Sequence, residues 1–255
     1  MISADEILID GQGLVPIGAT RELAPLSISV RSGTVTCFVG PDGSGKSHYL
    51  RALAGIDAVR AGQLTLLGHS AYNLGQEDWR QMRTKIGFLG SDTPLLSFLS
   101  GWRNVLFSPL YHRLAAPAEL EAKAHQLIAA LAIDADLEEL PAYLDDLAAH
   151  KLTIVRALML DPVVLFLDEP FRRFDTCSIR PVNKFLLDRV RERGMGLVIA
   201  THDLSLVSQY ADQVIFCSGG NLRVFTSGLE MVQSSFADVR EYVSQTTGEV
   251  KCDDE

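Results

Sequence analysis

Gly40-Pro41-Asp42-Gly43-Ser44-Gly45-Lys46-Ser47 matches the pattern GxxxxGK[ST], and it stands between an apolar run, Val35 to Val39, and a helical stretch, Ser47 to Leu53. Glycine-rich loops in this setting wrap chains of phosphates. Main-chain N–H groups can approach the phosphate oxygens because the glycines carry no side chain to obstruct them. The following helix presents its N-terminal amides to the same anion. The stretch therefore predicts an α/β fold, a P-loop NTPase core, with a triphosphate site between strand and helix.

The predicted cofactors are ATP and Mg²⁺. Lys46 is placed for the β- and γ-phosphate oxygens, and the Ser47 hydroxyl is a direct ligand for Mg²⁺. The predicted nucleotide contacts are Gly40, Pro41, Asp42, Gly43, Ser44, Gly45, Lys46, Ser47 and His48. The alternative is a glycine-rich turn with an accidental lysine, which the flanking strand and helix disfavour.

Composition is that of a globular chain: 47% of its 255 residues are hydrophobic and 22% are charged. The net charge of −9 disfavours a broad basic surface for nucleic acid. Its four cysteines are far apart and predict neither a disulfide framework nor a zinc site. The first ten residues do not resemble a secretory signal, and the apolar runs fall short of a membrane helix. We therefore expect a cytoplasmic protein.

Four regions are expected along the chain. Strand-like runs before and after the loop make residues 1–98 β-rich, and helical spacing interrupted by prolines makes 99–160 a helical insertion. Residues 161–228 alternate between buried strands and helices, as in a parallel sheet, and 229–255 form a C-terminal helix and tail. The predicted architecture is a parallel core sheet with an N-terminal antiparallel β subdomain and a helical insertion subdomain.

Two adjacent carboxylates end a second apolar run, in Val163-Val164-Leu165-Phe166-Leu167-Asp168-Glu169-Pro170. Ligands of parallel sheets bind at the carboxyl ends of the strands. Asp168 is predicted to hold Mg²⁺, and Glu169 to polarise the water that attacks the γ-phosphate. A solvated Asp-Glu-Pro turn is the alternative.

His202 follows another buried strand, Leu197 to Ala200, whose tip is expected beside that of the Asp168 strand. It could therefore reach the γ-phosphate, although a lone histidine is more often an ordinary polar residue. The predicted catalytic residues are Glu169, His202 and Lys46.

Together these motifs resemble the nucleotide-binding subunit of an ATP-binding-cassette (ABC) transporter over nearly the whole chain. The loop and Asp168-Glu169 match the two Walker motifs, Asp175 falls on the D-loop aspartate, and His202 on the switch histidine. The resemblance implies two subunits, in a homodimer or a heterodimer, that hold ATP between them. It also implies a multispanning membrane permease as partner, with the chain bound peripherally to the inner face of the cell membrane.

A finer resemblance is to the ATPase of Mla-type lipid transporters, which work with a lipid-shuttling MCE protein. It rests on Asn104 to Leu110, on Asp168-Glu169-Pro170-Phe171, and on the tail Phe236 to Tyr242. Nitrate- and taurine-type importers share the Phe after Asp-Glu-Pro, so they stay an alternative.

The chain departs from the family at the signature motif. Leu144-Asp145-Asp146-Leu147-Ala148 stands where the pattern is LSGGQ, so two carboxylates replace the serine hydroxyl and glycine amides. Like charges at ~4 Å would oppose closure on a nucleotide by about several kcal/mol at an effective dielectric near 20. Leu99-Ser100-Gly101 looks like a signature but lies too far upstream; Ser100 is either a helix cap or part of a coupling surface.

Other expected residues are also missing. Ser91 replaces the Q-loop glutamine, and no aromatic residue precedes Phe38, so the usual platform for adenine is absent and Val15 or Pro16 lies near its place. His48 replaces a Thr or Ser, and Arg172-Arg173 occupy the D-loop.

The losses fall on the part that a subunit lends to its neighbour. We therefore expect the chain to be one of two things. It is either one half of an asymmetric pair, with a partner whose signature is intact, or a homodimeric ATPase that is slow. A regulatory subunit that scarcely hydrolyses ATP is one alternative. A soluble ABC protein acting on DNA or ribosomes is another, disfavoured by the acidic balance and by a single cassette.

Overall fold

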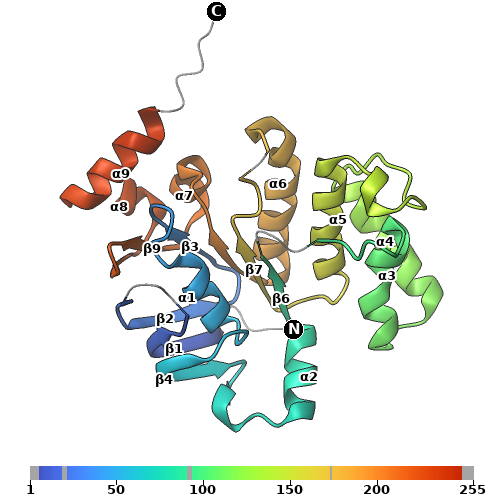
Figure 1. Cartoon of the computed structure of the whole chain (residues 1–255), viewed down its shortest axis with the longest axis horizontal. Helices are drawn as coiled ribbons and strands as arrows, with labels where there is room; N and C mark the ends of the chain where they lie inside the picture. The colour runs from blue at the N-terminus through green and yellow to red at the C-terminus, as the bar shows by residue number, and fades with distance from the viewer. Residues whose placement is uncertain (1–5, 19–21, 91–93, 173, 249–255) are drawn as a thin grey trace, which may run out of the picture.

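The computed structural model describes residues 6–18, 22–90, 94–172 and 174–248 (Figure 1). The strands are β1 (Ile7–Pro16), β2 (Leu26–Arg31), β3 (Val35–Val39), β4 (Val59–Leu66), β5 (His69–Ser70), β6 (Ile86–Leu89), β7 (Val164–Asp168), β8 (Gly196–Ala200), β9 (Gln213–Ser218) and β10 (Asn221–Phe225). The helices are α1 (Lys46–Leu53), α2 (Gln76–Lys85), α3 (Gly101–Tyr111), α4 (Pro117–Ala130), α5 (Asp146–Leu158), α6 (Thr176–Arg193), α7 (Leu204–Tyr210), α8 (Gly228–Val232) and α9 (Ala237–Gly248). Short 3₁₀ turns occur at Ala71–Asn73 and Pro141–Tyr143.

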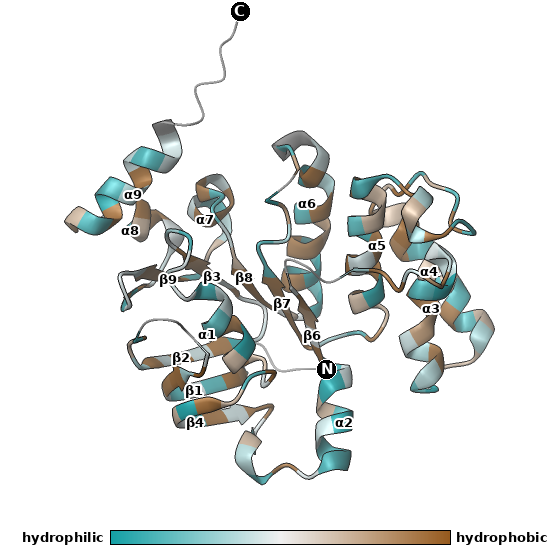
Figure 2. Ribbon diagram, viewed as in Figure 1, coloured by the Kyte–Doolittle hydropathy of each residue, from teal (hydrophilic) through white to brown (hydrophobic). Residues whose placement is uncertain are grey.

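A six-stranded sheet forms the centre of the described part of the chain, in the order β10-β9-β3-β8-β7-β6. Neighbouring strands run parallel, except that β10 pairs antiparallel with β9. Every residue of β3, β7 and β8 is buried, and Figure 2 shows the apolar character of these strands. Helices cover both faces of such a sheet, which is why its strands read as continuous apolar runs.

A second, antiparallel sheet has the order β2-β1-β4-β5 and lies beside α1 (Figure 1). Tyr49 and Leu50 of α1 are fully buried in one apolar core with residues from both sheets, including Ile9 of β1 and Phe166 of β7. The start of α1 is thereby fixed against the end of β3. Packing of this kind holds the connecting loop in one place.

Helices α3, α4 and α5 form a unit at the other side of the central sheet, and α8 and α9 lie at the opposite end of the molecule (Figure 1). Val105, Leu127 and Leu152, one from each helix of the unit, are at most 2% exposed in a core that continues to Leu165 of β7. Ser100 is the N-cap of α3, since its hydroxyl accepts a hydrogen bond from the N–H of Arg103 at 3.3 Å.

The predicted α/β fold is confirmed, with its parallel core, N-terminal antiparallel sheet and helical insertion. The four region boundaries stay a prediction. The sequence predicts strands at Ile7–Ile9 and Gln63–Leu67, and both strands start earlier or end later than predicted: β1 continues through Gly11 and Gly13 to Pro16, and β4 begins at Val59. In the residues that the structure describes, no helix combines the length and the apolar character that crossing a bilayer requires.

Candidate functional site

The phosphate loop connects β3 to α1, and its glycines adopt backbone conformations that other residues rarely take. Gly40 has φ +143°, and a Cβ there would lie 2.0 Å from the carbonyl oxygen of Cys217 in β9. Gly45, the N-cap of α1, has φ +101°. Side chains at these positions would be strained or would collide with the backbone, so the tight cradle depends on glycine.

Lys46 is the first residue of α1, and its side chain is 4% exposed. Its Nζ donates hydrogen bonds to the carbonyl oxygens of Gly40 at 2.7 Å and Pro41 at 3.1 Å. The ammonium group also lies 3.4 Å from Oε1 of Glu169. A buried cation is thus held over the loop, and its contact with the β- and γ-phosphates stays a prediction.

The residues present fit a magnesium-bound triphosphate. The Ser47 hydroxyl donates to Oδ1 of Asp168 at 2.9 Å, so two oxygen ligands from α1 and β7 stand together. Burial raises the pKa of Asp168, and a divalent cation beside it would offset that cost of desolvation. Among the described residues, the buried Ser44 hydroxyl has no hydrogen-bond partner. A phosphate oxygen would supply one.

Glu169 comes directly after β7 and adopts φ +47°, which is uncommon for a residue with a side chain. Its N–H donates to the carbonyl oxygen of Ala200 at 3.0 Å, which ties it to the end of β8. Its side chain is 12% exposed and faces Lys46 and His202. Backbone strain persists where the surroundings over-determine it, and such positions cluster at functional sites.

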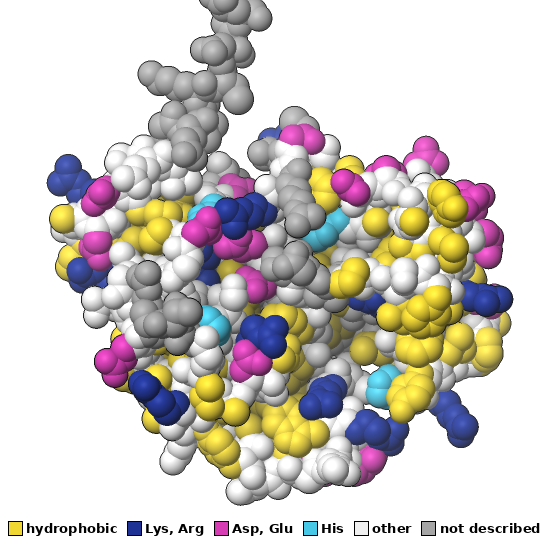
Figure 3. Space-filling view, viewed as in Figure 1, with side chains coloured by type: hydrophobic (Ala, Val, Ile, Leu, Met, Phe, Trp, Pro, Cys, Tyr) yellow, Lys and Arg dark blue, Asp and Glu magenta, His cyan; other side chains and the backbone are white. Residues whose placement is uncertain are grey.

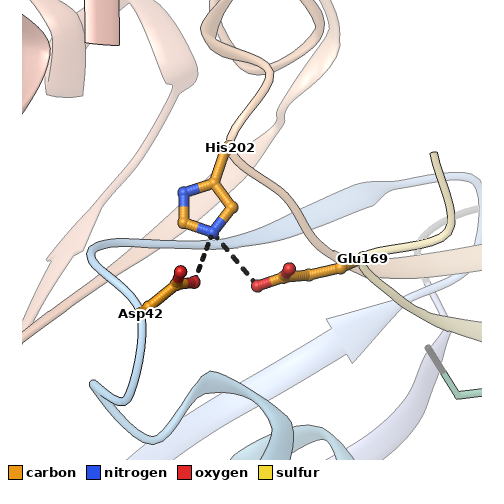
Figure 4. A group of neighbouring side chains, drawn as sticks. All are labelled: Asp42, Glu169 and His202. Atoms are coloured by element: carbon orange, nitrogen blue, oxygen red, sulfur yellow. Dashed lines mark hydrogen bonds and ion pairs between the residues drawn. The ribbon is translucent and has the colours of Figure 1, made fainter. Parts of the chain in front are cut away.

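His202 lies just beyond β8, where the pairing of Asp168 with Ala200 brings the ends of β7 and β8 together. Its Nε2 is 3.1 Å from Oε1 of Glu169 and 3.2 Å from Oδ1 of Asp42 (Figure 4). The structure therefore brings all three predicted catalytic residues together. Their roles in hydrolysis stay a prediction.

The sequence did not reveal two further neighbours of this site. Arg172 donates to Oδ2 of Asp42 at 2.7 Å and to Oε2 of Glu169 at 3.0 Å, so it links the phosphate loop to the end of β7. Tyr242 of α9 places its hydroxyl 2.9 Å from Nδ1 of His202. The three-residue spacing of Glu169 and Arg172 could have indicated the first contact. No local pattern indicates the second, because Tyr242 is 40 residues from His202.

The charges around Glu169 lower its pKa to about 2, first through the hydrogen bond from His202 and then through Lys46 and Arg172. A carboxylate whose pKa is depressed in the folded state stabilises the fold above its unfolded pKa, and this contribution is lost as the pH falls through the folded pKa.

We expect the difference in free energy of unfolding between wild type and Glu169→Gln to be about 3 kcal/mol at pH 7, from a pKa that is 4.5 in the unfolded chain and about 2 in the folded one. It should shrink from pH 4.5 downward. Urea titrations of both proteins from pH 7 to pH 3 measure it. A difference that stays constant over this range would show that Glu169 is not held as an anion.

The stretch predicted to be the signature, Leu144 to Ala148, leads into the first turn of α5, and Asp145 is the N-cap of that helix. Its Oδ1 accepts a hydrogen bond from the N–H of Ala148 at 2.8 Å. One of the two carboxylates is therefore turned onto its own helix. Asp146, the first residue of α5, is exposed.

Removing this cap by Asp145→Ala is expected to lower stability by about 1 kcal/mol, and Asp145→Asn to leave it nearly unchanged, since both Asp and Asn cap helices well. Asp146→Ala is the matched control, because Asp146 is not the capping residue. Thermal unfolding of the three variants measures this. Equal losses from Asp145→Ala and Asp146→Ala would rule out a capping role.

The remaining predicted residues are less informative. His48 lies in the first turn of α1, and its ring approaches Gly18. A Cβ atom added to Gly18 would lie 3.8 Å from Cε1 of His48. Asp175 is the N-cap of α6. Ser91 and Arg173 lie outside the described residues.

Comparison with known proteins identifies the family. The family model described as ABC transporter matches residues 23–172. The glutamine transport ATP-binding protein GlnQ of Escherichia coli is 30% identical over 205 residues, which cover 80% of this chain and 85% of GlnQ. The arginine transport ATP-binding protein ArgV of Corynebacterium glutamicum is 26% identical over 84% of this chain and 88% of its own.

Solved structures have the same fold. The ATP-binding subunit of an ABC transporter superposes with a TM-score of 0.78 at 21% identity and covers 94% of this chain and 99% of its own. A dimeric ATP-binding cassette bound to ADP and Pi also gives 0.78, at 20% identity, over 86% of this chain and 98% of its own. The chain therefore belongs to the ABC transporter family, as an ATP-binding domain that uses Mg²⁺ and ATP and has ATPase activity.

Proposed function

We propose that this chain is the ATPase subunit that drives a membrane permease and works as one half of a pair of ATP-binding subunits. The observation that carries the proposal is the convergence of β3, β7 and β8, whose ends bring Lys46, Ser47, Asp168, Glu169 and His202 into contact. Membership in the ABC transporter family supports the coupling of this ATPase to transport.

In this proposal Lys46 and the amides at the start of α1 hold the β- and γ-phosphates, while Ser47 and Asp168 hold Mg²⁺. The metal neutralises charge on the phosphates when it is bound. Glu169 orients the attacking water and accepts its proton, and His202 donates from Nε2 to a γ-phosphate oxygen.

In this proposal Glu169 becomes a base only when ATP binds. Its Oε1 is engaged by Lys46 at 3.4 Å and by His202 at 3.1 Å. A carboxylate whose pKa is about 2 is a poor base at neutral pH. A γ-phosphate would attract the Lys46 ammonium group and the His202 N–H more strongly than the carboxylate of Glu169 does. Its arrival would therefore free Oε1 for a water molecule.

An apolar cavity supports the proposed docking of a permease helix. It has a volume of about 300 Å³ and lies among α2, β6, α3 and α5, with Trp79, Met82 and Phe88 in its wall. Hydrophobic side chains gather over the helical unit nearby (Figure 3), where Phe107 and Tyr111 of α3 are 51% and 70% exposed. An amphipathic helix laid into a groove would cover such a surface.

The proposal extends to the transported substrate, for which there are two candidate classes. The tail around Tyr242 and the stretch Asp168 to Phe171 favour the lipid class, in which an MCE-type protein would be a further partner. The relatives named above act on arginine and glutamine by name, which favours small polar solutes.

The degenerate signature leads to a proposal about the pair. If the helix that begins at Asp146 faces the neighbour's γ-phosphate, the capped N-terminus and its two carboxylates offer that phosphate no hydroxyl or glycine amide. A site closed by this chain would lack donors that are each worth about 10²- to 10³-fold in rate. A site formed by this chain's phosphate loop and an intact signature from a different subunit would be complete.

Purification from detergent-solubilised membranes tests the proposed function. The tagged full chain is expected to bring down a multispanning protein, and Phe107→Glu is expected to release it, because a charge would enter the apolar contact. Glu77→Lys on the exposed face of α2 serves as a control that leaves the contact intact. Recovery of nucleic acid or ribosomes in place of a membrane protein would contradict the proposal.

A further inference from the structure

We propose that Tyr242 is a positioning residue for ATP hydrolysis: its hydroxyl holds the imidazole of His202 with Nε2–H directed at the phosphate site. The inference deepens the proposed function and rests on the role given there to His202. It gives α9 a role at the site, although Tyr242 lies 40 residues beyond His202 in the sequence.

The groups around the imidazole of His202 decide which of its nitrogens carries the proton. Nε2 faces two carboxylates, Glu169 at 3.1 Å and Asp42 at 3.2 Å, which lie closer to it than the Lys46 ammonium group does at 3.4 Å. Carboxylates can only accept hydrogen bonds, so Nε2 is the nitrogen that donates. In the neutral ring Nδ1 is then an acceptor, and the hydroxyl of Tyr242, 2.9 Å away, donates to it. The phenol thereby selects the tautomer that keeps Nε2–H toward the site.

The phenol of Tyr242 is itself held in place by its surroundings. Tyr242 is 8% exposed, and its ring packs edge-on against Phe216 of β9 with centroids 5.5 Å apart. Its hydroxyl also interacts with the backbone of Gly40 at the start of the phosphate loop. Val239, one turn earlier in α9, is fully buried. The hydroxyl is thus fixed relative to both the loop and the histidine.

Packing alone does not explain a tyrosine at position 242. A phenylalanine ring would fill the same space against Phe216, whereas only a phenol reaches Nδ1 of His202. A buried tyrosine hydroxyl needs partners, and here one of them is a ring nitrogen of a residue at the phosphate site. Losing the hydroxyl leaves Nδ1 without this donor and lets the imidazole rotate or change tautomer.

Tyr242→Phe in the full chain tests the inference. Single-turnover hydrolysis of Mg–ATP is expected to slow about tenfold, while the Kd for ATP stays within about twofold, because an orienting hydrogen bond is lost and no phosphate contact is removed. Tyr72→Phe is the matched control, since the Tyr72 hydroxyl bonds the Gly62 carbonyl oxygen away from the site. An unchanged rate, or a rate and an affinity that fall together, would overturn the inference.

A spectroscopic readout keeps the test independent of turnover. In ¹⁵N spectra of the nucleotide-free protein, wild-type His202 is expected to show the Nε2–H tautomer, and Tyr242→Phe to show a mixture of tautomers. Identical His202 signals in both proteins would overturn the inference.

His202→Ala separates this inference from the function on which it rests. If His202→Ala hydrolyses ATP as fast as wild type, the proposed role of His202 fails. If His202→Ala is slow and Tyr242→Phe is not, only the inference fails. Should Tyr242 act through His202, adding Tyr242→Phe to His202→Ala is expected to cause no further loss.

Discussion

Glu169→Gln is expected to lower the rate of ATP hydrolysis by about 10²- to 10⁴-fold while ATP still binds. The amide matches the carboxylate in size and still fits among Lys46, His202 and Arg172, but it cannot accept a proton from water. Loss of the negative charge next to the phosphates also removes a repulsion, so the Kd for ATP should stay equal or become lower.

Steady-state hydrolysis and equilibrium binding of ATP measure the two effects separately. Glu77→Gln is the matched control, because Glu77 pairs with Arg80 three residues later, as Glu169 pairs with Arg172. Turnover by Glu169→Gln within a few-fold of wild type would show that another group accepts the proton.

Lys46→Ala is expected to weaken ATP binding by about 100-fold or more, the cost typical of truncating one partner of a buried charge pair. The ammonium group is held by two carbonyl oxygens of the phosphate loop, so it is already fixed beside the predicted phosphate site. Its loss would remove a charge-assisted contact to phosphate and leave Glu169 with one counter-charge fewer.

Lys151→Ala provides the control for this variant. Lys151 is also buried, at 7% exposed, and its Nζ also donates to a carbonyl oxygen, that of Ala132. It lies in α5, away from the loop, so its truncation should affect stability and leave ATP affinity unchanged. Equal ATP affinity in Lys46→Ala and wild type would mean that the loop does not bind the triphosphate.

The motifs that were predictable from sequence are those in which a strand, a loop and a helix follow one another directly. Val35 to Ser47 is one such unit, and the run that ends in Asp168-Glu169 is another. Apolar runs of this length can be recognised as strands, because strands of a buried parallel sheet show no alternation of apolar and polar residues. Once β7 and β8 are neighbours, the proximity of Asp168 and His202 follows from the register.

What could not be predicted depends on contacts between distant segments. The full length of β1 was hidden by Gly11 and Gly13, around which its pairing shifts register. Arg172 looked like an unusual D-loop residue, and only the folded loop shows that it pairs with Asp42. Tyr242 reaches His202 through the packing of α9, which no spacing in the sequence encodes.

The signature position shows the limit of motif reading in another way. The sequence indicated only that two carboxylates stand at Asp145 and Asp146. The structure adds that one of them, Asp145, caps α5. One N–H group of the helix start is thus engaged within the chain, which supports the expectation that this surface offers a neighbour little with which to bind phosphate.

The central claim is that this chain supplies the residues of an ATP site that bind the phosphates and Mg²⁺ and that act as the base. It supplies no effective signature motif to the ATP site of its neighbour. Steady-state hydrolysis of Mg–ATP by the purified chain, alone and mixed with a subunit that has an intact signature, tests it most directly. We predict slow turnover alone and a rise of about 10²- to 10³-fold on mixing, abolished by Glu169→Gln in this chain. Fast turnover by the chain alone, with no gain from the second subunit, would contradict the claim.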